Sequence, residues 1–345
     1  MDDGKLKDFI LKNKIPAYRL GQIQKAIFLE AQPSFLNISN LPLELRNVLE
    51  KEIAILPFEI NTILVSKDNR AIKALLTLKD GNLIETVLIS PKPGVWSACI
   101  SSQVGCALGC LFCATGRGGF KRNLTVDEIT SQVLFWRQYI KSDLKLKDEN
   151  LKFENIVYMG MGEPFLNWEN VKKSIHELID PKLFGFRNRS ISVSTAGVVD
   201  KIEDFSRSFP QANLAISLHF ADNAKRNEFM KVNKLHDLDK LKEALQNYLA
   251  RSNRRIFIEY ILMDRVNDSR EDALKLARFL KGINNDKMLH VNLIRYNSIG
   301  FGLNPSSPET TQKFKDALKK EGVTVTIRKS LGSDISGACG QLAGE

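Results

Sequence analysis

The sequence lacks long hydrophobic runs, internal repeats and low-complexity tracts, and it contains few cysteines. No apolar run approaches the roughly 18 residues that a membrane-spanning helix needs, so we expect no membrane association. The 5 cysteines among 345 residues are too sparse for a small secreted disulfide scaffold. The first residues, Met1 to Lys5, are acidic and then mixed, which is not the pattern of a secretory signal peptide. These absences indicate a cytoplasmic protein.

The composition is that of an ordinary folded protein with an excess of positive charge. Hydrophobic residues make up 43% of the chain and charged residues 26%, which argues against disorder. The 50 Lys and Arg residues outnumber the 40 Asp and Glu residues, which gives a net charge of +10. This balance favours a polyanionic partner such as nucleic acid, although charge alone does not identify which one.

Patterns along the chain divide it into four segments. Residues 1–57 have apolar positions at helical spacing and predict a helical accessory or packing domain. Residues 58–91 predict a β-rich connecting segment. Residues 92–334 alternate strands and helices and form the expected core, and residues 335–345 are a C-terminal segment that carries Cys339.

The core has the strand–helix alternation that builds a parallel α/β sheet, either open or closed into a partial barrel. Thr125 and Glu128 form a capping box that marks the start of one core helix. The expected strands are 60–65, 71–78 and 83–89 in the connecting segment, and 155–160, 190–195, 214–218, 256–262, 290–296 and 323–327 in the core. The expected helices are 6–11, 19–29 and 43–53 in the accessory domain, and 125–140, 168–179, 199–209, 238–250, 269–280 and 308–320 in the core.

Small and polar residues follow the core strands at the point where each strand ends. Because the carboxyl ends of parallel strands meet at one edge of a sheet, these residues predict a shared ligand pocket. In chain order they belong to the runs Gly160–Pro164, Ser194–Gly197, Ser217–His219, Asn297–Ser298 and Arg328–Ser330, with Cys339 shortly beyond.

Three of the five cysteines stand close together in a Cys-x3-Cys-x2-Cys motif formed by Cys106, Cys110 and Cys113. A structural zinc site needs four ligands, and no second pair of cysteines or histidines accompanies this motif. Three thiolates suit a [4Fe–4S] cluster that leaves one iron open for a substrate or cofactor. A zinc site or a set of buried, inert cysteines stays open as the alternative.

The motif and its surroundings resemble the RlmN/Cfr family of radical S-adenosylmethionine rRNA adenine methyltransferases. The resemblance covers nearly the whole chain. It is carried by Cys99–Cys106, Phe112–Gly116, Gly119–Thr125, Met159–Pro164, Ser217–His219 and Ala338–Leu342. It implies a partial (βα)6 barrel of the radical S-adenosylmethionine type, with an N-terminal helical accessory domain and a small β extension.

The resemblance also implies a role for each candidate site residue. Cys106, Cys110 and Cys113 would ligate the cluster, whose open iron binds S-adenosylmethionine. Contacts to S-adenosylmethionine would come from Gly162, Glu163, Ser194, Ser217, Leu218, His219 and Asn297. Cys339 would carry a methyl group, Cys99 would resolve the intermediate through a transient disulfide, and Glu85 would accept a proton.

The implied reaction solves a chemical difficulty, because carbon 2 of adenine is too electron-poor to attack a methyl sulfonium. Two molecules of S-adenosylmethionine are used per turnover: one methylates Cys339, and the other yields the radical that joins the methyl carbon to RNA. Attack by Cys99 on the Cys339 sulfur then releases the product. The implied substrates are adenine 2503 of 23S rRNA and adenine 37 of tRNAs. The enzyme would act as a monomer with an electron donor such as flavodoxin or ferredoxin.

Several alternatives remain at this point. Arg295 resembles family members that methylate carbon 8 and confer antibiotic resistance, whereas the segments 119–124 and 162–167 resemble the carbon-2 type. A zinc-stabilised RNA-binding protein without catalysis is the alternative from another class. Glu85 could be a solvent-facing strand residue and His219 a core histidine. Lys121, Arg122, Arg187 and Arg189 are either phosphate contacts or a solvated basic face.

Overall fold

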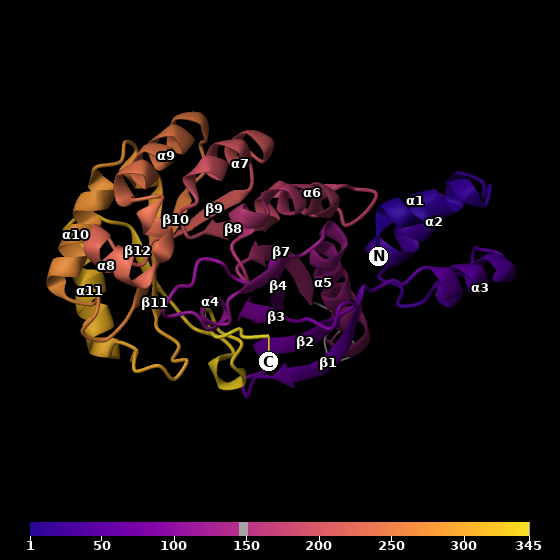
Figure 1. Cartoon of the computed structure of the whole chain (residues 1–345), viewed down its shortest axis with the longest axis horizontal. Coiled ribbons are helices and arrows are strands. Elements are labelled where there is room, and N and C mark those ends of the chain that lie inside the picture. Colours follow the sequence, from indigo (N-terminus) through magenta and orange to yellow (C-terminus); the bar gives the residue numbers. More distant parts are fainter. Residues whose placement is uncertain (145–150, 345) are drawn as a thin grey trace.

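A computed structural model describes residues 1–144 and 151–344, and its central feature is one continuous ten-stranded sheet (Figure 1). The strand order is β1-β2-β3-β4-β7-β8-β9-β10-β11-β12. The pairs from β1 to β4 are antiparallel, and those from β4 through β7 to β12 are parallel. The bounds are β1 Phe58–Val65, β2 Ala71–Leu78, β3 Leu83–Lys92, β4 Val95–Cys99, β7 Lys152–Tyr158, β8 Ile191–Thr195, β9 Asn213–Ser217, β10 Ile256–Leu262, β11 Leu289–Arg295 and β12 Val325–Arg328.

The parallel part of the sheet confirms the expected α/β partial barrel. β12 pairs with β11 alone, so in the part of the chain that the structure describes the sheet stays open at that edge. The connecting segment does not form a separate sheet, since β3 pairs with β4 and extends the core sheet through β2 to β1. The predicted strand ends agree with the structure to within three residues.

Helices cover the outer face of the parallel strands (Figure 1). Their bounds are α5 Val126–Tyr139, α6 Trp168–Ile179, α7 Ile202–Ser208, α8 Asn223–Phe229, α9 Leu238–Arg251, α10 Arg270–Lys281 and α11 Pro308–Lys320. The capping box at Thr125 and Glu128 is confirmed, with hydrogen bonds in both directions. The expectation of a helix from residue 199 was wrong in its first turn, which is a 3-10 turn, and α8 was not predicted.

The accessory segment is helical as predicted, and it lies at one end of the molecule (Figure 1). It contains α1 Asp3–Lys12, α2 Tyr18–Gln24, a π-helical turn Lys25–Leu29, and α3 Leu43–Glu52. Hydrogen bonds join it to α5: Arg137 donates to the Phe28 carbonyl, and Gln138 donates to the Gln32 carbonyl at 3.2 Å. Apolar residues of the segment, such as Phe28, also belong to the same buried cluster as Trp136 of α5. No helix of the described residues has the length and apolar character needed to cross a membrane.

A second, two-stranded sheet brackets the cysteine loop. β5 Gln103–Gly105 pairs with β6 Phe120–Asn123, and the short helix α4 Ala114–Arg117 lies between them in sequence. A Cβ atom on Gly105 would lie 1.9 Å from the Gly119 carbonyl oxygen, so only glycine permits this pairing. The sheet therefore fixes both ends of the loop that presents the three cysteines.

Candidate active site

The three cysteines of the motif share one cavity of about 170 Å³ at the carboxyl edge of the parallel strands. The same cavity is lined by Gly162, Glu163, Ser194, Ser217 and His219, which sequence analysis placed at this edge. The structure thus brings together residues from the ends of three strands, β7, β8 and β9, and from the cysteine loop. Leu218 and Asn297 lie outside this lining: Leu218 is fully buried in the core, and Asn297 donates to the Cys339 carbonyl at 3.1 Å.

The cysteine thiols lie in a desolvated environment. Burial raises the pKa of Cys106 to about 12, and it also raises the pKa values of Cys110 and Cys113. Cys106 and Cys113 add to the shift at Cys110, because neighbouring thiolates repel one another. Within the described residues, no group of His, Cys, Asp or Glu converges closely enough to hold a single metal ion. The thiols instead surround a cavity, an arrangement that suits the corners of an iron–sulfur cluster.

Arg226 supplies positive charge beside this cavity. Its side chain is fully buried and donates to Asn233 Oδ1 at 2.7 Å and to the carbonyls of Leu218 and Ala196. It forms no ion pair with any residue that the structure describes. The pKa of Cys110 is raised overall because the thiol is buried, and the positive charge of Arg226 partly opposes that rise. A buried guanidinium with neutral partners favours an anionic group in the cavity, as thiolates bound to iron would be.

Glu163 is the carboxylate of the cavity, and backbone amides hold it. It accepts hydrogen bonds from the N–H groups of Phe165 at 3.0 Å and Ala196 at 2.7 Å, while its own N–H donates to Gln103 Oε1 at 2.8 Å. Burial raises the pKa of Glu163 to about 7. An ammonium group bound beside it would restore the charged form, so Glu163 suits recognition of the amino group of S-adenosylmethionine.

His219 lines the cavity as a neutral imidazole. Burial lowers its pKa to about 3, and the charge of Arg226 contributes to the same direction. Its Nδ1 accepts a hydrogen bond from the Ile261 N–H at 3.2 Å, and its ring meets Phe112 edge-on with centroids 5.0 Å apart. Its backbone has a φ of +57°, a conformation that a histidine adopts rarely. Both the core contact and the cavity-facing position expected from sequence are therefore present.

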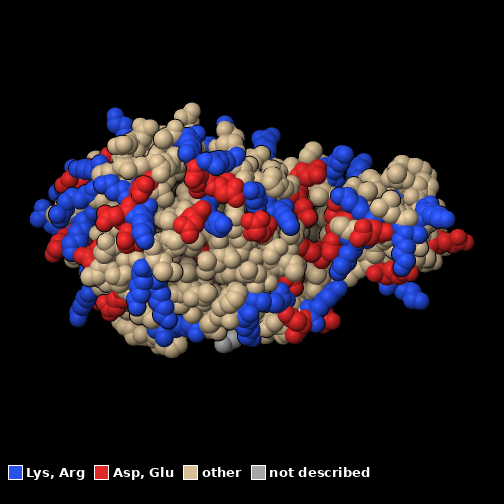
Figure 2. All heavy atoms as spheres, turned by 45° about the horizontal axis from the view of Figure 1, so that its top comes forward, with Lys and Arg blue, Asp and Glu red and all other residues tan. Residues whose placement is uncertain are grey.

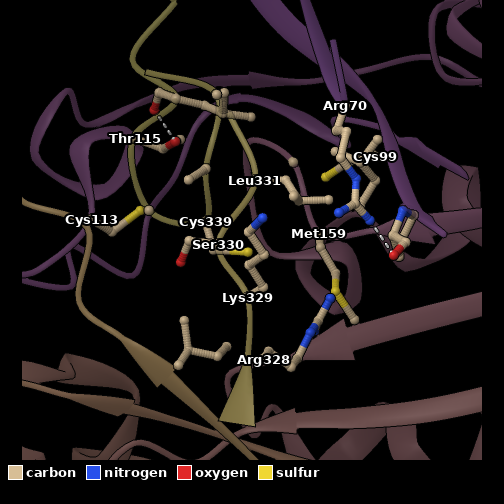
Figure 3. Close-up of a pocket in the computed structure, with 18 residues that line it drawn as sticks. Arg70, Cys99, Cys113, Thr115, Met159, Arg328, Lys329, Ser330, Leu331 and Cys339 are labelled. Atoms are coloured by element: carbon tan, nitrogen blue, oxygen red, sulfur yellow. Dashed lines mark hydrogen bonds between the residues drawn. The ribbon is translucent and has the colours of Figure 1, made fainter. Parts of the chain in front are cut away.

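Cys99 and Cys339 face a second cavity, of about 300 Å³, which shares Cys113, Met159 and Arg328 with the first. In the view of Figure 3 the Cys339 sulfur lies between Cys113 on one side and Cys99 on the other. Both Cys99 and Cys339 are free thiols. Crowding by protein atoms raises the pKa values of both, and the Arg328 guanidinium opposes that shift.

Glu85 lies in the interior, which excludes a solvent-facing position. It is 1% exposed, and Oε1 pairs with Lys73 Nζ at 2.6 Å. Oε2 accepts hydrogen bonds from the N–H groups of Ala343 at 2.7 Å and Gly344 at 3.1 Å. Glu85 is thus covered by the C-terminal segment and is not part of the lining of either cavity.

Sequence analysis missed several residues that support the site. Gln103 accepts the N–H of Glu163, and Arg226 donates to the carbonyl of Ala196 in the loop after β8. Glu259 pairs with Arg328, and Lys73 pairs with Glu85. The signal for Glu259 is a lone carboxylate in the apolar strand 256–262. Among the candidate phosphate contacts, Arg122 is occupied by Asp80 and Glu128, and Arg189 donates to Gln211. Lys121 and Arg187 have no such side-chain partner in the described part of the chain.

The open parallel sheet, the thiol loop at its carboxyl edge and the polar strand ends define a radical S-adenosylmethionine enzyme, and residues 100–277 match the Radical SAM superfamily. A crystal structure of a radical SAM methyltransferase from Sphaerobacter thermophilus superposes with a TM-score of 0.91, at 35% identity, over 100% of this chain and 98% of that chain.

Two curated relatives narrow the family. The "Ribosomal RNA large subunit methyltransferase Cfr" of Clostridium botulinum strain Okra is 39% identical over 99% of this chain and 97% of its own length. The "Probable dual-specificity RNA methyltransferase RlmN" of Syntrophomonas wolfei is 39% identical over 99% of this chain and 95% of its own length. The chain belongs to the RlmN/Cfr family of radical S-adenosylmethionine rRNA methyltransferases.

Membership confirms the enzyme class and the cofactors, a [4Fe–4S] cluster and two S-adenosylmethionine molecules per turnover. Membership in this family of enzymes excludes the alternative hypothesis of a zinc-stabilised RNA-binding protein without catalysis.

Proposed function

We propose that this methyltransferase acts on carbon 2 of adenine 2503 in 23S rRNA and on adenine 37 of tRNAs. The observation that carries the proposal is that Cys99 and Cys339, 240 positions apart in sequence, line one cavity that adjoins the cavity of the three motif cysteines. A methyl carrier and its resolving thiol must lie this close for a relay to work.

The assignment of residues follows from the two cavities. Cys106, Cys110 and Cys113 hold the cluster, and Glu163 with Ser194, Ser217 and His219 holds S-adenosylmethionine in the smaller cavity. Gly162 and the residues around Leu218 and Asn297 shape that cavity and the approach to Cys339. When bound, these cofactors supply a methyl group and one-electron chemistry. All other steps belong to the chain's own side chains.

The second cavity is the place for the target adenine. Cys339 carries the methyl group on its sulfur, and the bond from that carbon to the adenine ring tethers RNA to the protein. The Cys99 thiolate attacks the Cys339 sulfur, so a disulfide forms while the sulfur–carbon bond breaks. The released carbon keeps the electron pair of that bond and takes up a proton, which makes it the methyl group of the product. Glu85 takes the ring proton. The adenine must leave its base stack to enter, as in other enzymes that act on a base.

Carbon 2 is favoured over carbon 8 by the position of Arg295. This is the residue that resembles the carbon-8 members, yet its Nε donates to the Ser306 carbonyl at 2.8 Å and it lines neither cavity. In this position Arg295 gives the carbon-8 assignment no support from the cavity that would receive the adenine. The other proposed properties are a monomeric state, a flavodoxin or ferredoxin as electron donor, and RNA contacts from the accessory domain.

The charge distribution supports an RNA substrate. Lys and Arg side chains spread over the face shown in Figure 2, interleaved with Asp and Glu, and the net charge is +10. At the second cavity the cations are Arg70, Arg328 and the exposed Lys329. They suit the phosphates beside a flipped adenine.

Nucleoside mass spectrometry tests the regiochemistry. Expression in a bacterial strain that lacks its own enzyme is expected to restore 2-methyladenosine in 23S rRNA and tRNA. A product of 8-methyladenosine would establish the alternative carbon-8 activity.

The thiol relay has a separate test. Cys99→Ala should accumulate a covalent RNA adduct, and the double variant with Cys339→Ala should not. A Cys99→Ala protein that turns over normally and stays free of adduct would overturn the relay.

A further inference from the structure

An exposed phenylalanine lies against an arginine beside the active site. The Phe301 side chain is 57% exposed, and the Arg117 guanidinium carbon lies 3.9 Å from the centre of its ring. The arginine covers one face of the ring, and the remaining exposed area leaves the other face available. Large aromatic side chains with a free face are common at surfaces that bind a partner.

The pair is attached to both halves of the active site. Arg117 ends α4, and its N–H donates to the carbonyl of Cys113 at 3.1 Å. Phe301 lies in the loop after β11, where the Ser298 carbonyl accepts from Gln341 at 3.3 Å, two residues beyond Cys339. Three residues span at most about 11 Å, so the Cα atom of Phe301 lies within that distance of the Cα atom of Ser298.

The geometry of the pair is fixed before any partner arrives. Arg117 Nε donates to the Leu111 carbonyl at 2.9 Å, which holds the guanidinium plane against the ring. Among the described residues, its two Nη atoms have no hydrogen-bond partner. Gly300 and Gly302 flank the phenylalanine with φ values of +84° and +77°, so the loop turns sharply on both sides of it. The ring is therefore held outward, and the Nη groups of Arg117 are available to donate hydrogen bonds to a partner.

We propose that Phe301 and Arg117 form a stacking platform for an unpaired RNA base that neighbours the methylated adenine. The base stacks on the free face of Phe301, and the Nη groups of Arg117 donate to a phosphate of the same strand. The proposal rests on the RNA methyltransferase function, and it adds how the flanking nucleotide is held.

RNA is the favoured partner for two physical reasons. A target adenine that leaves its stack exposes the faces of its neighbours, and an aromatic ring replaces the lost contact without regard to base identity. The cation beside the ring complements a phosphate, and the chain carries a net charge of +10. An apolar protein partner would not use the free guanidinium donors.

The test uses the cluster-loaded enzyme and an RNA stem-loop that contains the target adenine with 2-aminopurine at each flanking position in turn. Stacking quenches 2-aminopurine fluorescence, so the wild-type enzyme should quench one flanking position. Phe301→Ala should abolish that quenching and raise the KM for RNA about tenfold, with little change in kcat. Phe301→Trp should retain both properties, and Arg117→Gln should raise KM and reduce its dependence on salt concentration.

Leu64→Ala is the matched control, because Leu64 is an exposed apolar side chain on β1. Unchanged quenching and KM in Phe301→Ala would overturn the platform. A Phe301→Ala variant that loses both kcat and cluster content would also overturn the platform, because that pattern would indicate a structural role for the ring. If the proposed function is wrong, the wild-type enzyme makes a different nucleoside or none. Quenching of 2-aminopurine still reports on stacking in that case, so the two proposals are tested separately.

Discussion

The Nζ atom of Lys73 lies 2.6 Å from Oε1 of Glu85, and both side chains are withdrawn from water. The second carboxylate oxygen is occupied by the backbone amides of Ala343 and Gly344. The proposed proton acceptor is therefore closed off by the same C-terminal segment that carries Cys339. For Glu85 to take a proton from RNA, the contact with residues 343 and 344 must open, which would couple Glu85 to movement of the proposed methyl carrier, Cys339.

The Lys73–Glu85 pair should contribute strongly to stability. Lys73→Met leaves a buried carboxylate without a counter-charge, and the free energy of unfolding should fall by about 3–5 kcal/mol. The double variant Lys73→Met with Glu85→Gln should recover part of this loss, since no buried charge then stays unpaired. Urea unfolding followed by circular dichroism measures both. Lys313→Met is the control, because Lys313 and Glu309 also lie 2.7 Å apart but are exposed, and little change is expected.

Gly162 should be required for S-adenosylmethionine binding through its shape. Its φ is +98°, and a Cβ atom there would lie 2.5 Å from the Gln103 Cβ. Gln103 Oε1 accepts the Glu163 N–H, so Gly162→Ala should displace both residues. Strain of about 1–3 kcal/mol predicts a weakening of affinity of about fivefold to a hundredfold, measured by anaerobic calorimetry.

The control for this variant is Gly81→Ala. Gly81 has a comparable φ of +79°, but a Cβ atom there would meet nothing within 4 Å. It should lower stability slightly and leave S-adenosylmethionine affinity unchanged. Equal affinities for wild type and Gly162→Ala would show that the Glu163 amide geometry is not needed for binding.

Most of the fold was predictable because long elements carry a periodic signal. The apolar strand Ile256–Leu262 and the capped helix after Thr125 were placed correctly, since burial on both faces and a capping box each depend on local sequence. The two-stranded sheet and α4 were not predicted. They depend on contacts such as the close approach of Gly105 to Gly119, which no periodicity reveals.

The site was predictable in its cysteines and strand ends, but not in its supporting residues. Glu85 alternates with apolar residues in its strand, which predicts a solvent-facing side chain, and it is buried because Lys73 and residues 343–344 cover it. Arg226 occurs in a polar segment and is buried because its partners are carbonyl groups from distant loops. Such partners leave no signature in side-chain identity.

Glu177 should make stability depend on pH. Burial raises its pKa to about 7, with the Thr130 hydroxyl at 3.2 Å opposing the shift and the carboxylates of Asp3 and Asp127 adding to it. The nearby cations are the Met1 amino group, which opposes the shift, and Lys7. The ordinary value is 4.5, so the folded state binds the proton more tightly between these values. The contribution is therefore complete below about pH 4.5 and is lost as the pH rises through about 7.

Glu177→Gln should remove this dependence. The free energy of unfolding of the variant should match that of wild type near pH 5 and exceed it at pH 8, measured by urea titrations across that range. Glu169→Gln is the control, because Glu169 is exposed on the same helix. A wild-type curve that does not fall relative to Glu177→Gln would contradict the raised pKa.

Arg328 should activate both reactive thiols. Its guanidinium pairs with Glu259 at 3.2 Å and lies on the wall of the cavity that Cys99 and Cys339 share (Figure 3). Crowding by protein atoms raises the pKa values of both thiols, and the charge of Arg328 counteracts this shift. Its removal should raise the pKa values of both thiols further and so lower the fraction present as thiolate.

Arg328→Gln is therefore expected to slow alkylation of Cys99 and Cys339 by iodoacetamide at pH 8 by about threefold to tenfold, and Arg328→Lys should slow it less. Peptide mass spectrometry of the cluster-loaded enzyme measures each thiol separately. Arg70→Gln is the control from the same cavity, because the Arg70 guanidinium is bound by the carbonyls of Ser90 and Pro91. If Arg328→Gln reacts as fast as wild type while Arg70→Gln is slowed, the activating cation is Arg70, and Arg328 serves only to position the end of β12.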